Sequence, residues 1–190
     1  MLADWQIQNA ADYGTSLRFH GLHISEFNEN HLNPASYDVT LSPMIRIPYK
    51  LDRHCRPLDV EEITNYTSLD EITTYYTLYP GEFILAASNE IITLPIGLAA
   101  RVEGKSSLGR LGLAVHITAG FIDPGFHGTI TLEIVNLLNR AIILRPNMRI
   151  AQIAFIPMDS VPVKSYTLTG HYQNQGLDGT PVESRYKMEG

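Results

Sequence analysis

The chain has 190 residues, of which 44% are hydrophobic and 18% charged, so it can form a folded core and is not disordered over most of its length. Fourteen Lys and Arg residues against 20 Asp and Glu residues give a formal net charge of -6. Proteins that hold DNA or RNA non-specifically have the opposite balance, so we expect no nucleic-acid partner. An anionic ligand must instead meet a local cluster of basic groups.

Cys55 is the single cysteine, which excludes an internal disulfide and a Cys-rich zinc site. A zinc deaminase is excluded too, because its Pro-Cys-x-x-Cys ligand pair needs two thiols. No apolar stretch reaches the roughly 18 residues of a membrane span, and the first residues lack the basic and then apolar order of a signal peptide. We therefore expect a cytoplasmic protein with no zinc and no membrane partner.

A short amphipathic helix is predicted at the start of the chain and should end near Tyr13 and Gly14. Its expected apolar positions are Leu2, Trp5, Ile7 and Ala10 or Ala11. Beyond it the sequence is typical of short strands, which we place at residues 37–41, 82–87, 141–144 and 150–156. The acidic, Thr- and Tyr-rich stretch 59–79 has scattered apolar residues, and we read it as an excursion from the main sheet.

The close spacing of these strands leaves no room for the crossover helices of a parallel sheet. A β-sandwich or partly closed β-barrel is the expected fold class, in one domain over residues 1–190. Residues 166–190 are rich in glycine and have the character of a tail. We expect this tail to order against a neighbouring subunit or a bound ligand.

The densest polar and glycine-rich segment is residues 104–112, with two hydroxyls and two cations within seven residues. Such a segment supplies the inward-pointing donors and positive charge that a phosphate group needs, although a plain Gly-rich turn between strands has the same composition. It is not a Walker A loop, since Ala99 stands where the first glycine is required. A phosphate site here must be built on a β scaffold.

Two carboxylates follow this segment within 30 residues. Asp123 precedes Pro124-Gly125, where a turn-forming Asp is the simplest interpretation. Glu133 lies mid-strand on the less apolar face of residues 129–136, a position that is often only solvent-facing. Together with the preceding loop, however, they could hold a nucleotide, and a carboxylate can act as general base on water without a thiol or metal ligand.

A serine-hydrolase triad is disfavoured, because no Gly-x-Ser-x-Gly elbow is present and His116 suits a core position equally well.

Three segments, residues 105–113, 116–126 and 131–136, resemble the dCTP deaminase branch of the dUTPase superfamily. The likeness extends to the start of the chain, to residues 33–41 and to the tail around Tyr172-Gln-Asn-Gln-Gly176. The resemblance implies a distorted β-barrel protomer with a short N-terminal helix, a homotrimer with active sites shared between subunits, and Mg²⁺ bound through the triphosphate of the substrate. It implies no direct protein ligand to that metal.

The resemblance also implies roles for individual residues. Glu133 matches the general base that activates the water attacking cytosine C4, Ser106 the serine that positions this water, and Asp123 the residue that holds the deoxyribose 3′-hydroxyl. Arg110 matches the main cation of the triphosphate loop. The full set of implied nucleotide-binding residues is Lys105, Ser106, Ser107, Leu108, Gly109, Arg110, Asp123, Thr131, Leu132, Glu133, Gln152, Tyr166 and Gln175.

This chain departs from the family at His171, where a lysine is common, and in the short gap after Tyr166. Gly120-Phe121 matches the Gly-aromatic pair of the bifunctional, dUMP-forming branch, whereas enzymes that stop at dUTP tend to carry His-Arg. We therefore expect deamination of dCTP followed by hydrolysis to dUMP and pyrophosphate. In the second step Asp123 is the residue expected to orient the attacking water.

Three alternatives stay open on the sequence. A monofunctional deaminase would release dUTP. A dUTPase without deaminase activity is disfavoured, because the chain lacks a glycine-rich phosphate-clamping motif at its end and would leave Glu133 without a role. A trimeric regulator could bind dTTP or dCTP without turnover, and dTTP could also be an inhibitor of the enzyme.

Overall fold

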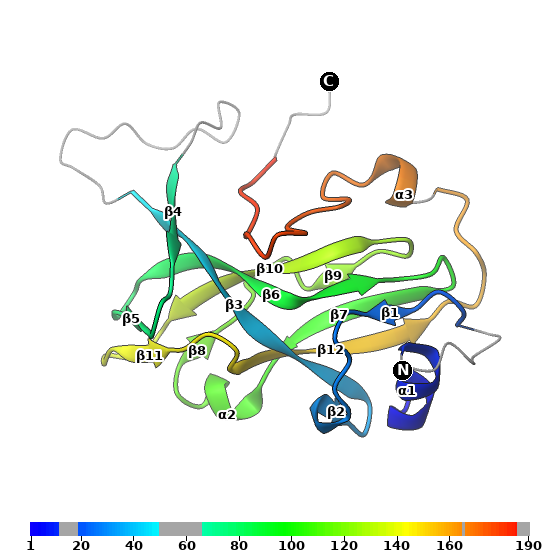
Figure 1. Ribbon diagram of the computed structural model, residues 1–190, viewed down its shortest axis with the longest axis horizontal. Coiled ribbons are helices and arrows are strands. Elements are labelled where there is room, and N and C mark those ends of the chain that lie inside the picture. Colours follow the sequence, from blue (N-terminus) through cyan, green and yellow to red (C-terminus); the bar gives the residue numbers. More distant parts are fainter. Residues whose placement is uncertain (12–18, 50–65, 165, 186–190) are drawn as a thin grey trace.

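The computed structural model describes residues 1–11, 19–49, 66–164 and 166–185 (Figure 1). The helices are α1 (Asp4–Ala11), α2 (Ser106–Gly109) and α3 (Tyr166–Thr169), with a 3-10 turn at Glu29–His31. The strands are β1 (His23–Ile24), β2 (Leu32–Asn33), β3 (Ser36–Pro48), β4 (Thr67–Glu71), β5 (Tyr76–Leu78), β6 (Phe83–Thr93), β7 (Leu98–Gly104), β8 (Leu113–Ala114), β9 (Phe121–Ile122), β10 (His127–Asn136), β11 (Ile142–Leu144) and β12 (Arg149–Pro157).

Most strands form one antiparallel sheet in the order β8-β10-β6-β3-β12-β7-β9, and β5 and β11 form a separate pair. Strand β3 belongs to both halves of this sheet, because its first part pairs with β12 and its second part with β6 and β4. Its register on β6 shifts between Leu41 and Ile45. Such an irregularity bends a strand and increases its twist, so the sheet curls and brings β9, the last strand of the order, toward β10, the second.

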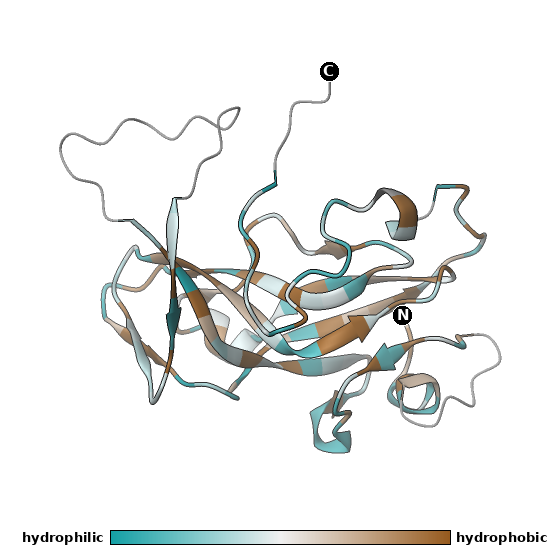
Figure 2. Ribbon diagram, turned by 45° about the horizontal axis from the view of Figure 1, so that its top comes forward, coloured by the Kyte–Doolittle hydropathy of each residue, from teal (hydrophilic) through white to brown (hydrophobic). Residues whose placement is uncertain are grey.

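The curled sheet encloses a continuous apolar core. Tyr37 and Phe155 are its largest fully buried side chains, and residues 36–42 of β3 are buried on both faces. Hydrophobic segments lie mainly along the strands, and the turns around the edge of the molecule are hydrophilic (Figure 2). The expected all-β class is therefore confirmed, since strands make up most of the regular structure and one curled sheet encloses the core.

The expected strands correspond to parts of β3, β6, β11 and β12. The N-terminal helix forms at Asp4–Ala11 and buries Ile7, Ala10 and Ala11, but Trp5 was wrongly placed on its apolar face, since its side chain is 61% exposed. The expected end of this helix near residues 13–14 and part of the 59–79 excursion lie outside the described residues. None of the described helices has the length and apolarity needed to cross a membrane.

The described part of the tail, residues 166–185, packs on its own chain (Figure 1). Gln175 forms a bridge with Gly128 of β10, and Thr129 donates its backbone N–H to the Gln175 carbonyl at 3.1 Å. The reason is that β10 presents free backbone groups here, which the tail satisfies.

Candidate active site

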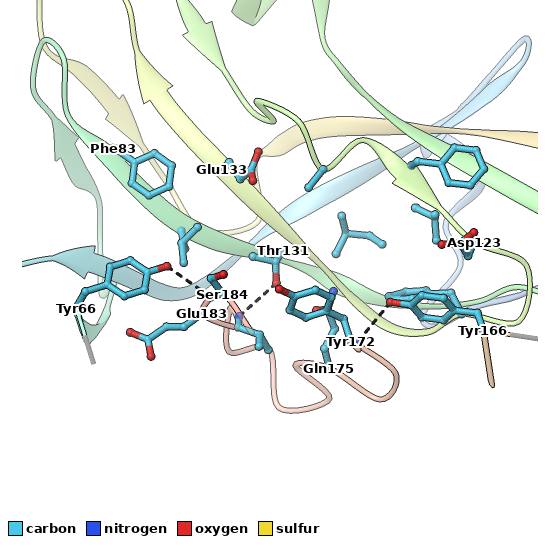
Figure 3. Close-up of a pocket in the computed structure, with 17 residues that line it drawn as sticks. Tyr66, Phe83, Asp123, Thr131, Glu133, Tyr166, Tyr172, Gln175, Glu183 and Ser184 are labelled. Carbon is cyan, nitrogen blue, oxygen red and sulfur yellow. Dashed lines mark hydrogen bonds between the residues drawn. The ribbon is translucent and has the colours of Figure 1, made fainter. Parts of the chain in front are cut away.

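A cavity of about 280 Å³ lies between the tail and the strands β6, β9 and β10 (Figure 3). Its size is near the lower end of the roughly 300–1,000 Å³ typical of small-molecule sites. The lining residues that also belong to the sequence prediction are Phe121, Asp123, Thr131, Glu133, Tyr166 and Gln175. The curl of the sheet and the return of the tail thus bring together residues from three separate parts of the chain.

Glu133 is half-buried on β10, opposite Leu85 of β6. Its Oε2 accepts hydrogen bonds from the backbone N–H groups of Ile117 and Thr118, at 2.7 and 3.0 Å. Two donors on one oxygen fix the orientation of the carboxylate, and Oε1 has no hydrogen-bond partner among the described residues, so it is available as an acceptor. This arrangement suits a group that takes a proton from a bound water.

Asp123 stands at the first position of a tight turn after β9. The Phe126 N–H donates to the Asp123 carbonyl at 3.2 Å, and Gly125 has φ +89°, which with Pro124 defines a type II turn. The turn bond is therefore accepted by the backbone of Asp123 and not by its carboxylate. The carboxylate is exposed and lines the cavity beside Tyr166 (Figure 3).

The tail contributes one wall of the cavity. Gln175 is buried and donates from Nε2 to the Thr129 carbonyl at 2.9 Å, while Val182 donates its N–H to Thr131 Oγ1 at 3.2 Å. The Tyr172 N–H donates to the Tyr166 hydroxyl at 3.3 Å. Burial raises the pKa of Tyr166, so this hydroxyl keeps its proton at neutral pH and can still donate to a ligand.

The predicted phosphate loop lies elsewhere. Ser106, Ser107, Leu108 and Gly109 form α2, which Figure 1 shows on the opposite side of the sheet from α3 and the tail. Ser106, Ser107, Gly109 and Arg110 are exposed, and no residue of this segment lines the cavity. Arg110 forms no ion pair with any residue that the structure describes. One chain by itself therefore does not bring the loop to Glu133.

Three further predicted residues are also away from the cavity. Lys105 donates from Nζ to Asp38 Oδ2 at 2.6 Å. Gln152 accepts from Ser36 Oγ at 2.7 Å and donates to the Gly104 carbonyl at 3.1 Å. Leu132 has no side-chain exposure and belongs to the core, because β-strand alternation turns it away from the face that carries Thr131 and Glu133.

Of the Gly120-Phe121 pair, Gly120 lies in the interior and Phe121 lines the cavity. Phe121 is 61% exposed and lines the cavity, whereas Gly120 is buried, and its carbonyl accepts from the Val102 N–H at 2.7 Å. The pair therefore joins the cavity wall to strand β7.

Sequence reasoning missed much of the cavity wall. The additional lining residues are Tyr66, Phe83, Leu85, Ala119, Ile122, Phe126, Ile130, Tyr172, Val182, Glu183 and Ser184. Tyr172 stands inside the tail motif and could have been included on that ground. Tyr66 and Phe83 come from strand starts that only the tertiary fold brings near Glu133, so no local signal marks them.

The described residues contain no group of three or more His, Cys, Asp or Glu side chains placed to hold a metal ion.

Comparison with known proteins gives a consistent result. The dCTP deaminase-like family profile matches residues 1–158. A Corynebacterium kroppenstedtii protein named dCTP deaminase, dUMP-forming, is 42% identical over 180 residues, covering 92% of each chain. A Mycobacterium avium protein of the same name is 43% identical over 159 residues, covering 81% of this chain and 83% of the other.

The crystal structure of 2′-deoxycytidine 5′-triphosphate deaminase from Agrobacterium tumefaciens shares the fold with a TM-score of 0.62 at 22% identity. The match covers 81% of this chain and 47% of that one, so the chain spans about half the length of the Agrobacterium protein.

Proposed function

The chain belongs to the dCTP deaminase-like family, and on this basis we propose that it converts dCTP to dUMP in two hydrolytic steps at one site. The first step releases ammonia and the second releases pyrophosphate. The observation that carries the proposal is the carboxylate of Glu133, which borders the cavity with one oxygen held by two backbone amides and the other available. The names of the relatives above support the dUMP-forming outcome.

In the deamination step Glu133 Oε1 takes a proton from a water molecule whose oxygen attacks C4 of the cytosine ring. Glu133 delivers this proton to the ring nitrogen N3, and the resulting tetrahedral centre carries both the hydroxyl and the amino group. Glu133 then takes the hydroxyl proton and delivers it to the amino nitrogen, the C4–N bond breaks, ammonia leaves, and the oxygen on C4 becomes the carbonyl of uracil. The amides of Ile117 and Thr118 keep Oε2 fixed, so the same oxygen can accept and deliver the proton.

In the second step a water attacks the α-phosphorus of dUTP, and the bond to the bridging oxygen breaks to give dUMP and pyrophosphate. Asp123 is the carboxylate we assign to orienting this water and to holding the 3′-hydroxyl, because it lines the same cavity. Arg110 supplies positive charge to the triphosphate. The other residues assigned to the nucleotide are Ser106, Thr131, Tyr166 and Gln175.

The donor set favours Mg²⁺ that is bound through the triphosphate, because the described residues form no carboxylate or imidazole cluster of their own for a metal. When bound there, Mg²⁺ neutralises phosphate charge and makes pyrophosphate a better leaving group. Asp123, Glu133 and Glu183 would otherwise repel the phosphates from the cavity.

We propose that the site is completed by a second chain in a homotrimer. Support comes from the separation within one chain: Glu133 and Asp123 border the cavity, whereas Arg110 directly follows α2, which lies on the opposite side of the sheet from the tail (Figure 1). Arg110 forms no ion pair with the residues that the structure describes. A neighbouring copy could bring its own 105–110 loop to this cavity. As an enzyme of free deoxynucleotides, the protein would work in the cytoplasm.

The product assay tests the proposal. Purified protein is incubated with dCTP and Mg²⁺, ammonia is assayed, and dCTP, dUTP, dUMP and pyrophosphate are separated by ion exchange. We expect ammonia, dUMP and pyrophosphate in equal amounts with no free dUTP. Accumulating dUTP would show a monofunctional deaminase, and binding without turnover would show a regulator. Added dTTP in the same assay tests whether it inhibits.

Glu133→Gln tests the role of the base. We expect ammonia release to fall by about 10²–10⁴-fold, the range for a lost general base, while dCTP binding by calorimetry stays within a few-fold. Unchanged ammonia release would exclude Glu133 as the base.

A further inference from the structure

The start of the predicted phosphate loop is held by a buried ion pair. The Asp38 side chain on β3 is only 1% exposed, and its Oδ2 lies 2.6 Å from Nζ of Lys105. Lys105 is the residue directly before α2. Asp38 Oδ1 accepts from Asn33 Nδ2 at 2.9 Å. Arg149 lies farther away, with Nη1 at 3.6 Å from the same Oδ2 and a side chain that is 53% exposed. Lys105 is therefore the main partner of a carboxylate that water does not reach.

A second tether acts on the preceding residue. Ser36 donates from Oγ to Gln152 Oε1, and Gln152 donates from Nε2 to the carbonyl of Gly104, the last residue of β7. Ser36 and Asp38 are two apart on β3 and so share one face of the strand. Gln152 pairs in register with Asp38 on one side and with Glu103 on the other. Both tethers thus reach from β3 to two consecutive residues at the start of the loop.

The loop itself has little else to fix it. No residue of α2 is buried, and Leu108 is its one member that packs against the core. An exposed turn of this kind takes its position from its anchors. A buried carboxylate, in turn, is stable only with its cationic partner in place, so Asp38 constrains Lys105 strongly.

We propose that Asp38 is a positioning residue that fixes the phosphate loop through Lys105, and that the Lys105 ammonium is engaged by Asp38 and not by the nucleotide. Gln152 acts in the same way through Ser36 and Gly104. Arg110 is then the cation of the loop that meets the triphosphate. This inference rests on the proposed function, because it concerns the loop to which the triphosphate is assigned.

The test compares Asp38→Asn and Lys105→Met with the double variant. We expect each single variant to raise the KM for dCTP by about 10-fold or more, with kcat at saturation changed by less than about 3-fold, because the loop is misplaced and the base is untouched. The Ki of inorganic tripolyphosphate should rise by the same factor. Inhibition by deoxycytidine, which has no phosphate, should not change.

The double variant separates positioning from direct contact. If Lys105 acts only through Asp38, the double variant is no worse than either single one, since coupled residues are not additive. A further 10-fold loss on adding Lys105→Met to Asp38→Asn would mean that Lys105 touches phosphate itself, and would overturn the proposal. Lys105→Arg keeps the pair and should retain most of the dCTP affinity.

Arg149→Gln is the matched control, because it removes a cation from the same carboxylate but from an exposed position that does not lead to the loop; its KM should stay within about 2-fold of the wild type. Amide hydrogen exchange at residues 106–112 should accelerate in Asp38→Asn and not in Arg149→Gln. If Asp38→Asn fails to fold, Lys105→Met and its exchange rates carry the test.

Arg110→Ala, measured in parallel, distinguishes a failure of the phosphate assignment of the loop from a failure of the positioning role of Asp38. If it leaves both the dCTP KM and tripolyphosphate inhibition unchanged, the assignment of the loop to phosphate fails. If Arg110→Ala weakens both and Asp38→Asn weakens neither, the proposed function stands and the positioning role of Asp38 is wrong.

Discussion

The imidazole ring of His116 occupies the space beside Gly120, so that a Cβ on Gly120 would lie 3.2 Å from Cε1 and 3.3 Å from Nδ1 of the ring. His116 Nδ1 is buried without a hydrogen-bond partner among the described residues. The next two residues, Ile117 and Thr118, donate their amides to Glu133. A change at Gly120 therefore acts through His116 on the segment that orients the carboxylate.

Gly120→Ala should strain this contact. Overpacking of a tight site typically costs about 1–3 kcal/mol, and we expect a loss of that size in the free energy of unfolding together with slower ammonia release. His116→Ala in the same chain should relieve the contact with the ring but not the 3.3 Å contact of the new Cβ with the Val102 carbonyl. The double variant should therefore be less impaired than the sum of the two single changes, without full recovery. Denaturant unfolding and ammonia assays on the four proteins test this. Additive losses would show that His116 and Gly120 are independent.

Mixed oligomers test whether the site is shared. Glu133→Gln and Arg110→Ala should each be nearly inactive alone. Co-expressed, they should regain a fraction of wild-type activity, since an Arg110→Ala chain still supplies Glu133 and a Glu133→Gln chain still supplies Arg110. The control is each variant co-expressed with itself. If mixtures stay as inactive as these controls while the chains co-purify, both residues serve a site within one chain.

The tail is fastened by Arg46. Its Nε donates to the Pro181 carbonyl at 2.8 Å, its Nη1 lies 3.8 Å from Glu183 Oε1, and Ser42 Oγ donates to the Gly179 carbonyl at 2.7 Å. The Thr67 hydroxyl also donates a hydrogen bond to the Glu183 carboxylate. These contacts hold the segment that forms one wall of the cavity.

Arg46→Gln should loosen this segment. We expect the KM for dCTP to rise several-fold with a smaller effect on kcat, and trypsin to cleave faster after the exposed Lys164, because the variant loses both the half-buried ion pair with Glu183 and the hydrogen bond to the Pro181 carbonyl. Arg145→Gln, at an exposed arginine that takes part in none of these bonds, serves as the control. Equal proteolysis and kinetics in both variants would show that Arg46 does not retain the tail.

Glu90 predicts a pH dependence of stability. Burial raises the pKa of this carboxyl, although hydrogen bonds from Thr40 to both of its oxygens oppose the shift. The sign follows from linkage: an acid whose pKa is raised by folding stabilises the protein at pH values below its ordinary pKa, and this contribution is lost as the pH rises through the raised value. From neutral pH downward, Glu90 therefore adds stability.

Glu90→Gln should remove this part of the pH dependence. As the pH is lowered from neutral to the ordinary Glu range, the unfolding free energy measured by urea titration should gain less, or fall more, in Glu90→Gln than in the wild type. Glu103→Gln, an exposed acid on β7, should leave the slope nearly unchanged. A slope in Glu90→Gln equal to that of the wild type would contradict the prediction.

The sequence predicted the strands β3 and β12 in part, because short runs rich in Val, Ile, Thr, Tyr and Phe between turn residues are a local property. The prediction that Trp5 lies on the apolar face of the N-terminal helix was wrong. Helical spacing indicates which residues share a face, but it does not give the width of the helix surface that packs against the core. The sequence could not place Tyr66 or Phe83 in the cavity, because their approach to Glu133 depends on how the sheet curls.

The sequence by itself determined the fold class and the inventory of chemical groups: the alternating strands, the turn at Asp123, the mid-strand Glu133 and the basic loop ending at Arg110. Each of these features can be identified from residues that are neighbours in the sequence. The tertiary structure alone decided which groups converge. It brought Glu133 and Asp123 to one cavity under the tail and left α2, which Arg110 directly follows, on the other side of the sheet, because the curl of one sheet sets distances between residues that no local pattern encodes.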